Sequence, residues 1–73
     1  MSARTVVIYG PAGCGKTSNA ESLRQHFCCT SVVDDFDPHR HRITPGALHL
    51  SHQPYRHQRD VESYDFAAIL PQL

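Results

Sequence analysis

The sequence contains no run of about 18 apolar residues, so we expect no membrane-spanning helix. It has no excess of one charge either, because seven lysine and arginine residues balance seven aspartate and glutamate residues. This balance gives no indication of a nucleic-acid or membrane partner. Cysteine is scarce and odd in number, at three, so a disulfide framework is not expected. No signal peptide precedes the first apolar segment, which begins almost at Met1, and we therefore expect a cytoplasmic protein.

The length of the chain sets a second limit. With 73 residues it has room for one domain, residues 1–73, and no linker or internal repeat divides it. A chain of this size buries only about 60% of its unfolded surface, so its fold is expected to be marginally stable alone.

Three of the four glycines lie in residues 10–17, whose sequence GPAGCGKT fits the pattern G-x-x-x-x-G-K-[ST] of a phosphate-binding loop. Gly10 and Gly15 are needed because a Cβ would block close approach to a phosphate or prevent the turn with positive φ that points the amides inward. Lys16 supplies a mobile positive charge for the β- and γ-phosphates, and the Thr17 hydroxyl is a hard oxygen suited to Mg²⁺.

The sequence on either side of this loop fits the same interpretation. Residues 4–9, RTVVIY, form the β-branched apolar run expected of a buried parallel strand. After the loop, Ala20, Leu23 and Phe27 recur at helical spacing and predict one apolar helix face. The positive N-terminal end of that helix would add to phosphate binding.

With this strand, loop and helix in order, residues 4–38 resemble the P-loop NTPase superfamily, whose loop is the Walker A motif. The resemblance implies a bound nucleotide, ATP first and ADP or GTP as alternatives, together with Mg²⁺. The nucleotide-binding residues that it implies are Gly10, Gly13, Cys14, Gly15, Lys16, Thr17 and Ser18. Domains of this superfamily are about twice as long or longer, so we expect a minimal P-loop fold, a fragment, or a protein completed by another copy or a partner.

The rest of the chain predicts a small α/β protein. Further strands are expected at residues 30–34, 47–51 and 61–66, followed by a helical turn at 67–70. Asp65 is placed to cap that turn. The predicted order is β-α-β-β-β-α with a small, mainly parallel sheet, and residues 35–46 contain no convincing helix. Such a sheet has open edges, so a homo-oligomer or a complex with a host protein is expected.

Residues 34–38, DDFDP, follow the second predicted strand. This segment looks like the D-D-F-x-P segment of small-molecule P-loop kinases of the gluconate-kinase-like and uridine-kinase-like types. The resemblance implies that Thr17 and Asp34 hold Mg²⁺ and that Lys16 and Asp35 act in catalysis, with Asp35 positioning the acceptor. The alternative is that these acidic residues only form a turn.

The histidines and arginines of the second half give weaker predictions. The spacing of His39, His41, His49, His52 and His57 does not fit a zinc site. His49 alternates with two leucines and is predicted to face solvent or a polar groove. Three roles stay open for the arginines: an arginine finger, an anion- or nucleic-acid-binding patch together with Tyr55, or solvated loop charges. These arginines are Arg40, Arg42, Arg56 and Arg59.

Two functions from different classes remain open. One is a minimal nucleotide-dependent phosphotransferase or weak NTPase. No carboxylate follows the strand at 47–51, where Ser51 could act as a sensor of the γ-phosphate, and this absence argues against fast ATP hydrolysis. The other is a nucleotide-binding accessory protein without turnover, generally similar in size to the phage proteins that inhibit CRISPR or other host defences. A loop that no longer binds nucleotide is a third interpretation.

Overall fold

The computed structural model describes residues 4–11, 15–55 and 60–73. Within these residues the elements are β1 (Val6–Tyr9), α1 (Ala20–His26), β2 (Ser31–Phe36), β3 (Ala47–Ser51), β4 (Glu62–Asp65), α2 (Phe66–Ile69) and the 3₁₀ helix η1 (Leu70–Gln72). The predicted order of strands and helices is therefore confirmed. Five residues singled out in the sequence lie outside the described ranges, and they are Gly13, Cys14, Arg56, His57 and Arg59.

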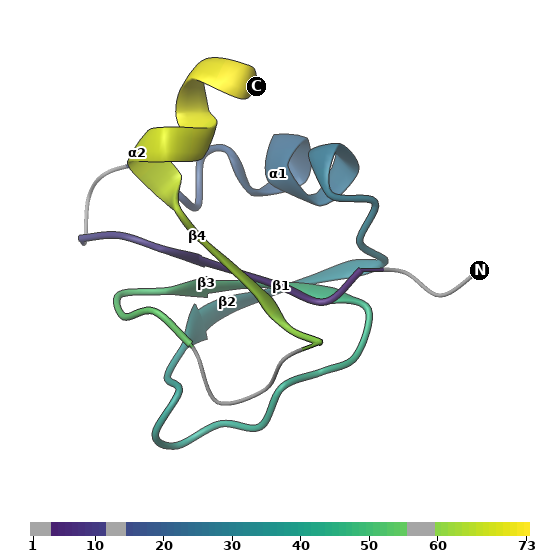
Figure 1. Ribbon diagram of the computed structural model, residues 1–73, viewed down its shortest axis with the longest axis vertical. Coiled ribbons are helices and arrows are strands. Elements are labelled where there is room, and N and C mark those ends of the chain that lie inside the picture. The colour runs from purple at the N-terminus through teal and green to yellow at the C-terminus, as the bar shows by residue number, and fades with distance from the viewer. Residues whose placement is uncertain (1–3, 12–14, 56–59) are drawn as a thin grey trace.

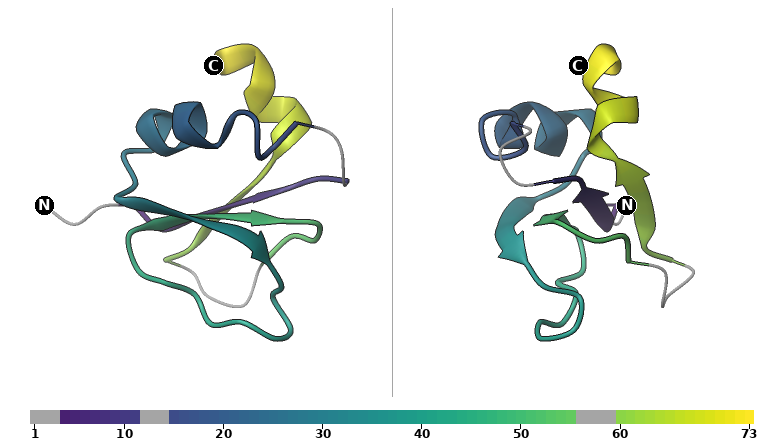
Figure 2. Two further views of the ribbon diagram at one scale, coloured as in Figure 1. Left: turned by 180° about the vertical axis from the view of Figure 1, so that it is seen from behind. Right: turned by 90° about the vertical axis from the view of Figure 1, so that its left-hand side faces the viewer.

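The described strands form one sheet in the order β2-β3-β1-β4. Each neighbouring pair is parallel, so the sheet is fully rather than mainly parallel, and the α/β fold class is confirmed. Both helices lie over the same face of the sheet, while the loop of residues 37–46 runs beneath the other face (Figures 1 and 2). Because the strands run in one direction, all their carboxyl ends meet at one edge of the sheet, where ligands of open α/β sheets collect.

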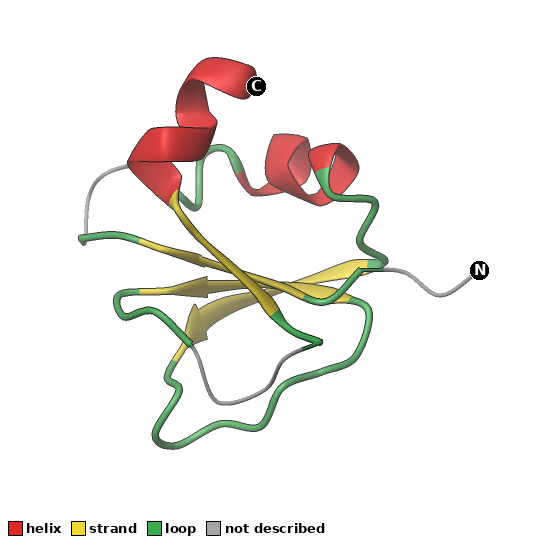
Figure 3. Ribbon diagram, in the orientation of Figure 1, coloured by secondary structure: helices red, strands yellow, loops and turns green. Residues whose placement is uncertain are grey.

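The main core fills the space between the sheet and the helices. It consists of Val6, Ile8, Leu23, Phe27, Cys29, Leu48, Leu50, Phe66 and Ile69. The predicted apolar face of α1 is confirmed, since Leu23 and Phe27 are buried and Ala20 packs against this core. Each fully buried leucine stabilises the fold by about 1.5–3 kcal/mol relative to an exposed one. Figure 3 shows that the helices cover only one side of the sheet.

Strand β3 is buried at all five positions, on both faces of the sheet. The prediction that His49 faces solvent or a polar groove is therefore wrong, because its side chain is 0% exposed. On this second face the ring of Phe36 lies edge-on to His49, with ring centroids 4.7 Å apart. The 37–46 loop, which contains no helix as predicted, covers the sheet here in place of a helical layer (Figure 1).

The edge strand β4 is held to its neighbours by a polar and aromatic network. The guanidinium of Arg4 donates hydrogen bonds to the Glu62 carboxylate, one of them 2.7 Å long, and this contact lowers the pKa of Glu62. Tyr64 donates its hydroxyl to Glu62 at 2.6 Å and stacks on Phe27 at 5.1 Å. The predicted cap at Asp65 is confirmed, because its carboxylate accepts the Ala67 N–H at 3.0 Å. No helix among the described residues is long and apolar enough to cross a membrane.

Helix α1 ends in a left-handed turn at Cys28. The Cys29 N–H donates to the Arg24 carbonyl at 2.9 Å and the Cys28 N–H to the Gln25 carbonyl at 3.2 Å, which is the Schellman pattern. Cys28 takes φ 57°, a conformation that favours glycine. Its side chain is exposed, so it contributes no core packing that would offset this cost.

We predict that Cys28→Gly raises the free energy of unfolding by about 1 kcal/mol, because glycine adopts the left-handed turn without the Cβ penalty. For a domain of this size the thermal midpoint should rise by about 4–8 °C. Cys28→Ala, which keeps the Cβ, is the matched control and should leave the midpoint nearly unchanged. An equal midpoint for the glycine and alanine variants would contradict this account.

Candidate functional site

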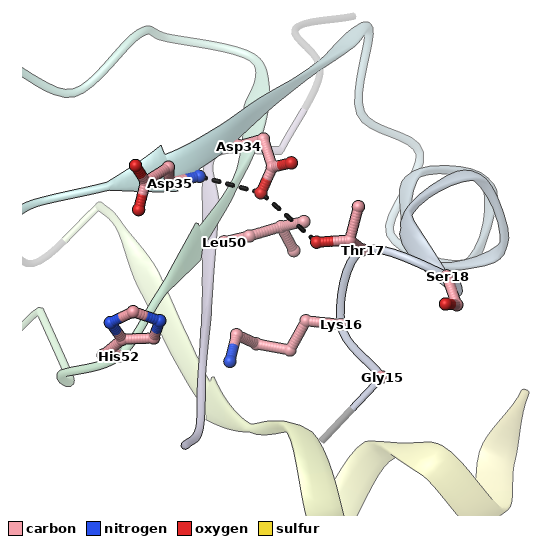
Figure 4. Close-up of a pocket in the computed structure, with 8 residues that line it drawn as sticks. All are labelled: Gly15, Lys16, Thr17, Ser18, Asp34, Asp35, Leu50 and His52. Atoms are coloured by element: carbon pink, nitrogen blue, oxygen red, sulfur yellow. Dashed lines mark hydrogen bonds between the residues drawn. The ribbon is translucent and has the colours of Figure 1, made fainter. Parts of the chain in front are cut away.

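A cavity of about 440 Å³ lies at the carboxyl edge of the sheet (Figure 4). Its lining residues are Gly15, Lys16, Thr17, Ser18, Asp34, Asp35, Leu50 and His52. The chain thus brings the glycine-rich segment together with the acidic pair that the sequence singled out 17 residues later. Gly10 is not among the residues that line the cavity.

Gly10 anchors the start of the loop. Its N–H donates to the Ser51 carbonyl at 3.1 Å, which joins the end of β1 to the end of β3. Lys16 then folds back over the loop, and its Nζ donates to the carbonyls of Gly10 at 2.7 Å and Pro11 at 3.0 Å. The lysine is 7% exposed, yet its ammonium is directed along the cavity toward His52 (Figure 4). Its positive charge is consequently held at the cavity by neutral acceptors.

Gly15 is required by its backbone conformation and not by crowding. Its φ is 100°, which L side chains rarely adopt. A Cβ built there would lie 3.5 Å from Asn19 Nδ2 and 3.9 Å from Phe66, both ordinary contacts. The Asn19 side chain donates to the Gly15 carbonyl at 2.9 Å and so fixes the exit of the loop. Regular helix begins only at Ala20, with turns between, later than the loop motif predicts.

A β-bulge sets the geometry of the acidic pair. In the pairing of β2 with β3, Val33 lies opposite His49 and Phe36 opposite Ser51, so Asp34 and Asp35 share the space of one residue. Asp35 takes φ 54°, in the left-handed region. In a regular strand these two neighbours would point to opposite faces, but here both line the same cavity. Strand β2 therefore continues to Phe36, and the prediction that it ends at Asp34 is wrong.

Asp34 faces the loop. Its Oδ1 accepts the Asp35 N–H at 2.8 Å and the Thr17 hydroxyl at a long 3.5 Å. The two oxygens of this long contact are the hard donors that Mg²⁺ prefers, and Mg²⁺ commonly takes one or two protein ligands with water and phosphate oxygens completing its shell. Thr17 and Asp34 therefore fit a magnesium ion. The described residues contain no group of three or more histidine, cysteine, aspartate or glutamate side chains that could form an all-protein metal site.

Asp35 and His52 form the other side of the cavity. The Asp35 carboxylate is exposed, points away from Thr17 (Figure 4), and accepts no hydrogen bond from a described side chain. His52 follows β3 directly, at the same edge, while Leu50 supplies an apolar wall. Sequence reasoning did not place His52 or Leu50 here, although the position of His52 just after a predicted parallel strand could have indicated it.

Two other polar residues near the acidic pair have local structural roles. The Asp37 carboxylate accepts the His39 N–H at 2.9 Å, and its carbonyl accepts the N–H of His41 at 2.8 Å, so this residue caps a turn. Ser51 is buried, and its hydroxyl donates to the Gln53 carbonyl at 2.9 Å. Ser51 is the last residue of β3, its hydroxyl is engaged by the turn that follows, and it does not line the cavity, which argues against its interpretation as a phosphate sensor.

The histidines and arginines of the 37–46 loop lie apart from the cavity. His39 contacts the Gln53 side chain at 3.1 Å, and Arg40 pairs with Asp37 at 3.6 Å. Neither Arg40 nor Arg42 lines the cavity, so neither is positioned as an arginine finger within the same chain. Both are exposed, as solvated loop charges would be.

Comparison of the chain with protein-family models, with curated proteins and with solved structures gave no match. The arrangement of the residues alone therefore carries the functional inference.

We predict that the bulge makes Asp35 sensitive to side-chain shape. Asp35→Val should lower the free energy of unfolding by about 2 kcal/mol, because a β-branched residue is strained at positive φ. Asp35→Asn should change the free energy of unfolding by no more than about 0.5 kcal/mol, because asparagine tolerates the left-handed region. Denaturant unfolding of both variants checks the difference, and equal stabilities would show that the left-handed bulge does not form in solution.

Proposed function

We propose that this protein binds a nucleoside triphosphate, ATP in the first place, with Mg²⁺ through residues 10–18, and transfers its terminal phosphoryl group to a small hydroxyl acceptor. The observation that carries the proposal is the convergence of Lys16, Thr17 and both aspartates of the bulge on one cavity. Its volume of about 440 Å³ falls in the range of small-molecule sites, about 300–1,000 Å³.

Each of these residues has a distinct task in the proposed reaction. Lys16, whose ammonium is already held beside the cavity, offsets the negative charge of the phosphates. Thr17 and Asp34 would hold the Mg²⁺, which when bound neutralises the charge of the phosphate oxygens. Asp35 accepts the proton of the acceptor hydroxyl, since its carboxylate is exposed and directed to the other side of the cavity. Catalysis of this kind depends on positioning and electrostatics more than on covalent chemistry.

A second candidate function is a nucleotide-binding accessory protein of the phage type that acts through protein contact without turnover. The openness of the site favours it, because Asp34, Asp35 and His52 are all exposed and phosphoryl transfer needs a site that excludes water. Another copy of the chain or a host protein complex would then cover the carboxyl edge. For either function we infer a cytoplasmic location, where nucleoside triphosphates are available.

We predict that calorimetric titration detects Mg²⁺·ATP binding to the wild-type protein and that Lys16→Ala weakens it by about 10- to 100-fold, the loss expected for one charged hydrogen-bond donor. Arg40→Ala is the matched control, because it removes one positive charge from an exposed position outside the cavity. It should leave the affinity unchanged.

The same titration decides between the interpretations. Absence of heat and of thermal stabilisation by Mg²⁺·ATP in the wild-type protein would refute nucleotide binding altogether. Binding without phosphate release or transfer, tested with sugar, polyol and nucleoside acceptors, would favour the accessory protein. Transfer that Asp35→Asn abolishes, while Mg²⁺·ATP affinity is retained, would favour the phosphotransferase.

A further inference from the structure

His49 is a buried imidazole that contacts β1, the 37–46 loop and the end of β2. Its Nδ1 lies 3.0 Å from the Val6 carbonyl of β1, and its Nε2 lies 3.0 Å from the backbone N–H of Thr44 in the 37–46 loop. Its ring also meets Phe36, the residue that ends β2 directly after the acidic bulge. The side chain is 0% exposed. This one residue therefore joins β1, the loop and the end of β2.

The two hydrogen-bond partners determine the state of the ring. A carbonyl can only accept, so Nδ1 of His49 carries the proton; a backbone N–H can only donate, so Nε2 is unprotonated. His49 is consequently neutral with the proton on Nδ1. A second proton on Nε2 would remove the acceptor of the Thr44 N–H and bring two donors face to face.

We propose that His49 is an acid-sensitive latch, which holds the middle of the 37–46 loop and the end of β2 against the sheet and releases them when its imidazole is protonated. The loop has a separate attachment at Gly46, whose N–H donates to the Thr5 hydroxyl at 2.9 Å and whose carbonyl accepts the Thr30 N–H at 2.8 Å. These contacts contain no group that titrates near neutral pH. Protonation therefore frees the Thr44 N–H, while the Thr44 carbonyl, which accepts the Ala47 N–H at 3.1 Å, and Gly46 stay attached.

Burial lowers the pKa of His49, since removal from water disfavours the charged form. The unfolded or released segment has a histidine of ordinary pKa, about 6.5, and so binds a proton more readily than the latched state. The latched state therefore keeps its full stability above about pH 6.5. Its stability falls as the pH drops below 6.5, and the loss becomes constant once the pH is below the pKa of the buried ring.

Other titratable or charged side chains lie under the same loop. His41, Arg42, Tyr55 and Asp60 line a cavity of about 410 Å³ under the same loop, and the rings of His41 and Tyr55 lie 6.0 and 6.2 Å from that of Phe36. His41 accepts the Asp37 N–H at Nδ1 and is exposed, so it needs its own control.

The direct test measures amide hydrogen exchange of Thr44 relative to Gly46 in the wild-type protein from pH 8 to pH 5. Below pH 6.5 we expect the ratio of the Thr44 protection factor to that of Gly46 to decrease by up to about tenfold per pH unit, because one proton is linked to the release. Nitrogen NMR should show His49 protonated at Nδ1 and not at Nε2 at pH 8. A ratio independent of pH, or a His49 protonated at Nε2 at pH 8, would overturn the proposal.

Two variants test whether the pH dependence of Thr44 exchange comes from His49 or from His41. His49→Gln has an amide that can replace both hydrogen bonds and does not titrate, so the Thr44 ratio should lose its pH dependence. His41→Asn keeps an acceptor for Asp37 and should retain the wild-type pH dependence. If His49→Gln does not fold, the wild-type exchange ratio and the NMR assignment still decide the question.

The consequence for the site rests on the proposed function. Because Phe36 directly follows Asp35, release of the latch should disturb the bulge, and Mg²⁺·ATP affinity should fall more steeply from pH 8 to pH 5 in the wild-type protein than in His49→Gln. Equal declines would overturn this coupling. If the wild-type protein binds no Mg²⁺·ATP at pH 8, the proposed function fails, whereas the exchange ratio of Thr44 still tests the latch.

Discussion

The pairing of the buried strand β3 with β1 on one side and β2 on the other is the constraint on which the site depends. All five residues of β3 are buried, and three of the contacts that shape the site start from this strand. Its Ser51 carbonyl holds the Gly10 N–H at the start of the loop, its Leu50 forms the cavity wall, and its His49 fastens the loop on the opposite face. A parallel strand buried on both faces requires every polar group to have a partner, and His49 and Ser51 meet that requirement.

The register between β3 and β2 explains why two neighbouring carboxylates face one cavity. Without the bulge, Asp34 and Asp35 would point to opposite faces of the sheet. The extra residue in β2 places both aspartates on the cavity, and Asp35 takes a left-handed backbone conformation as a result. Asp34 then approaches Thr17, while Asp35 stays at the other end of the cavity. Strain at this point is consistent with a functional site, since such conformations persist where the surrounding structure maintains them.

The sequence predicted most of what depends on local pattern, and it failed where a distant partner decides. The strand predicted from the β-branched run at residues 4–9, the face of α1 and the cap at Asp65 follow from local pattern and local hydrogen bonding, and the structure confirms them, with β1 at Val6–Tyr9. The bulge could not be predicted, because it is defined by the register of Asp34 and Asp35 against β3. The burial of His49 was missed because alternation with leucines suggests one exposed face, whereas its partners come from Val6 and Thr44.

The central claim is that the bulge brings Asp34 to Thr17 so that the two act as one magnesium-binding unit. A double-mutant cycle of Thr17→Ala and Asp34→Asn, with ATP affinity measured in Mg²⁺ and in excess EDTA, tests it most directly. The account predicts that either variant alone removes most of the Mg²⁺-dependent affinity, that the double variant loses little more, and that affinity in EDTA is nearly unchanged. Independent, additive losses, or equal losses with and without Mg²⁺, would contradict it.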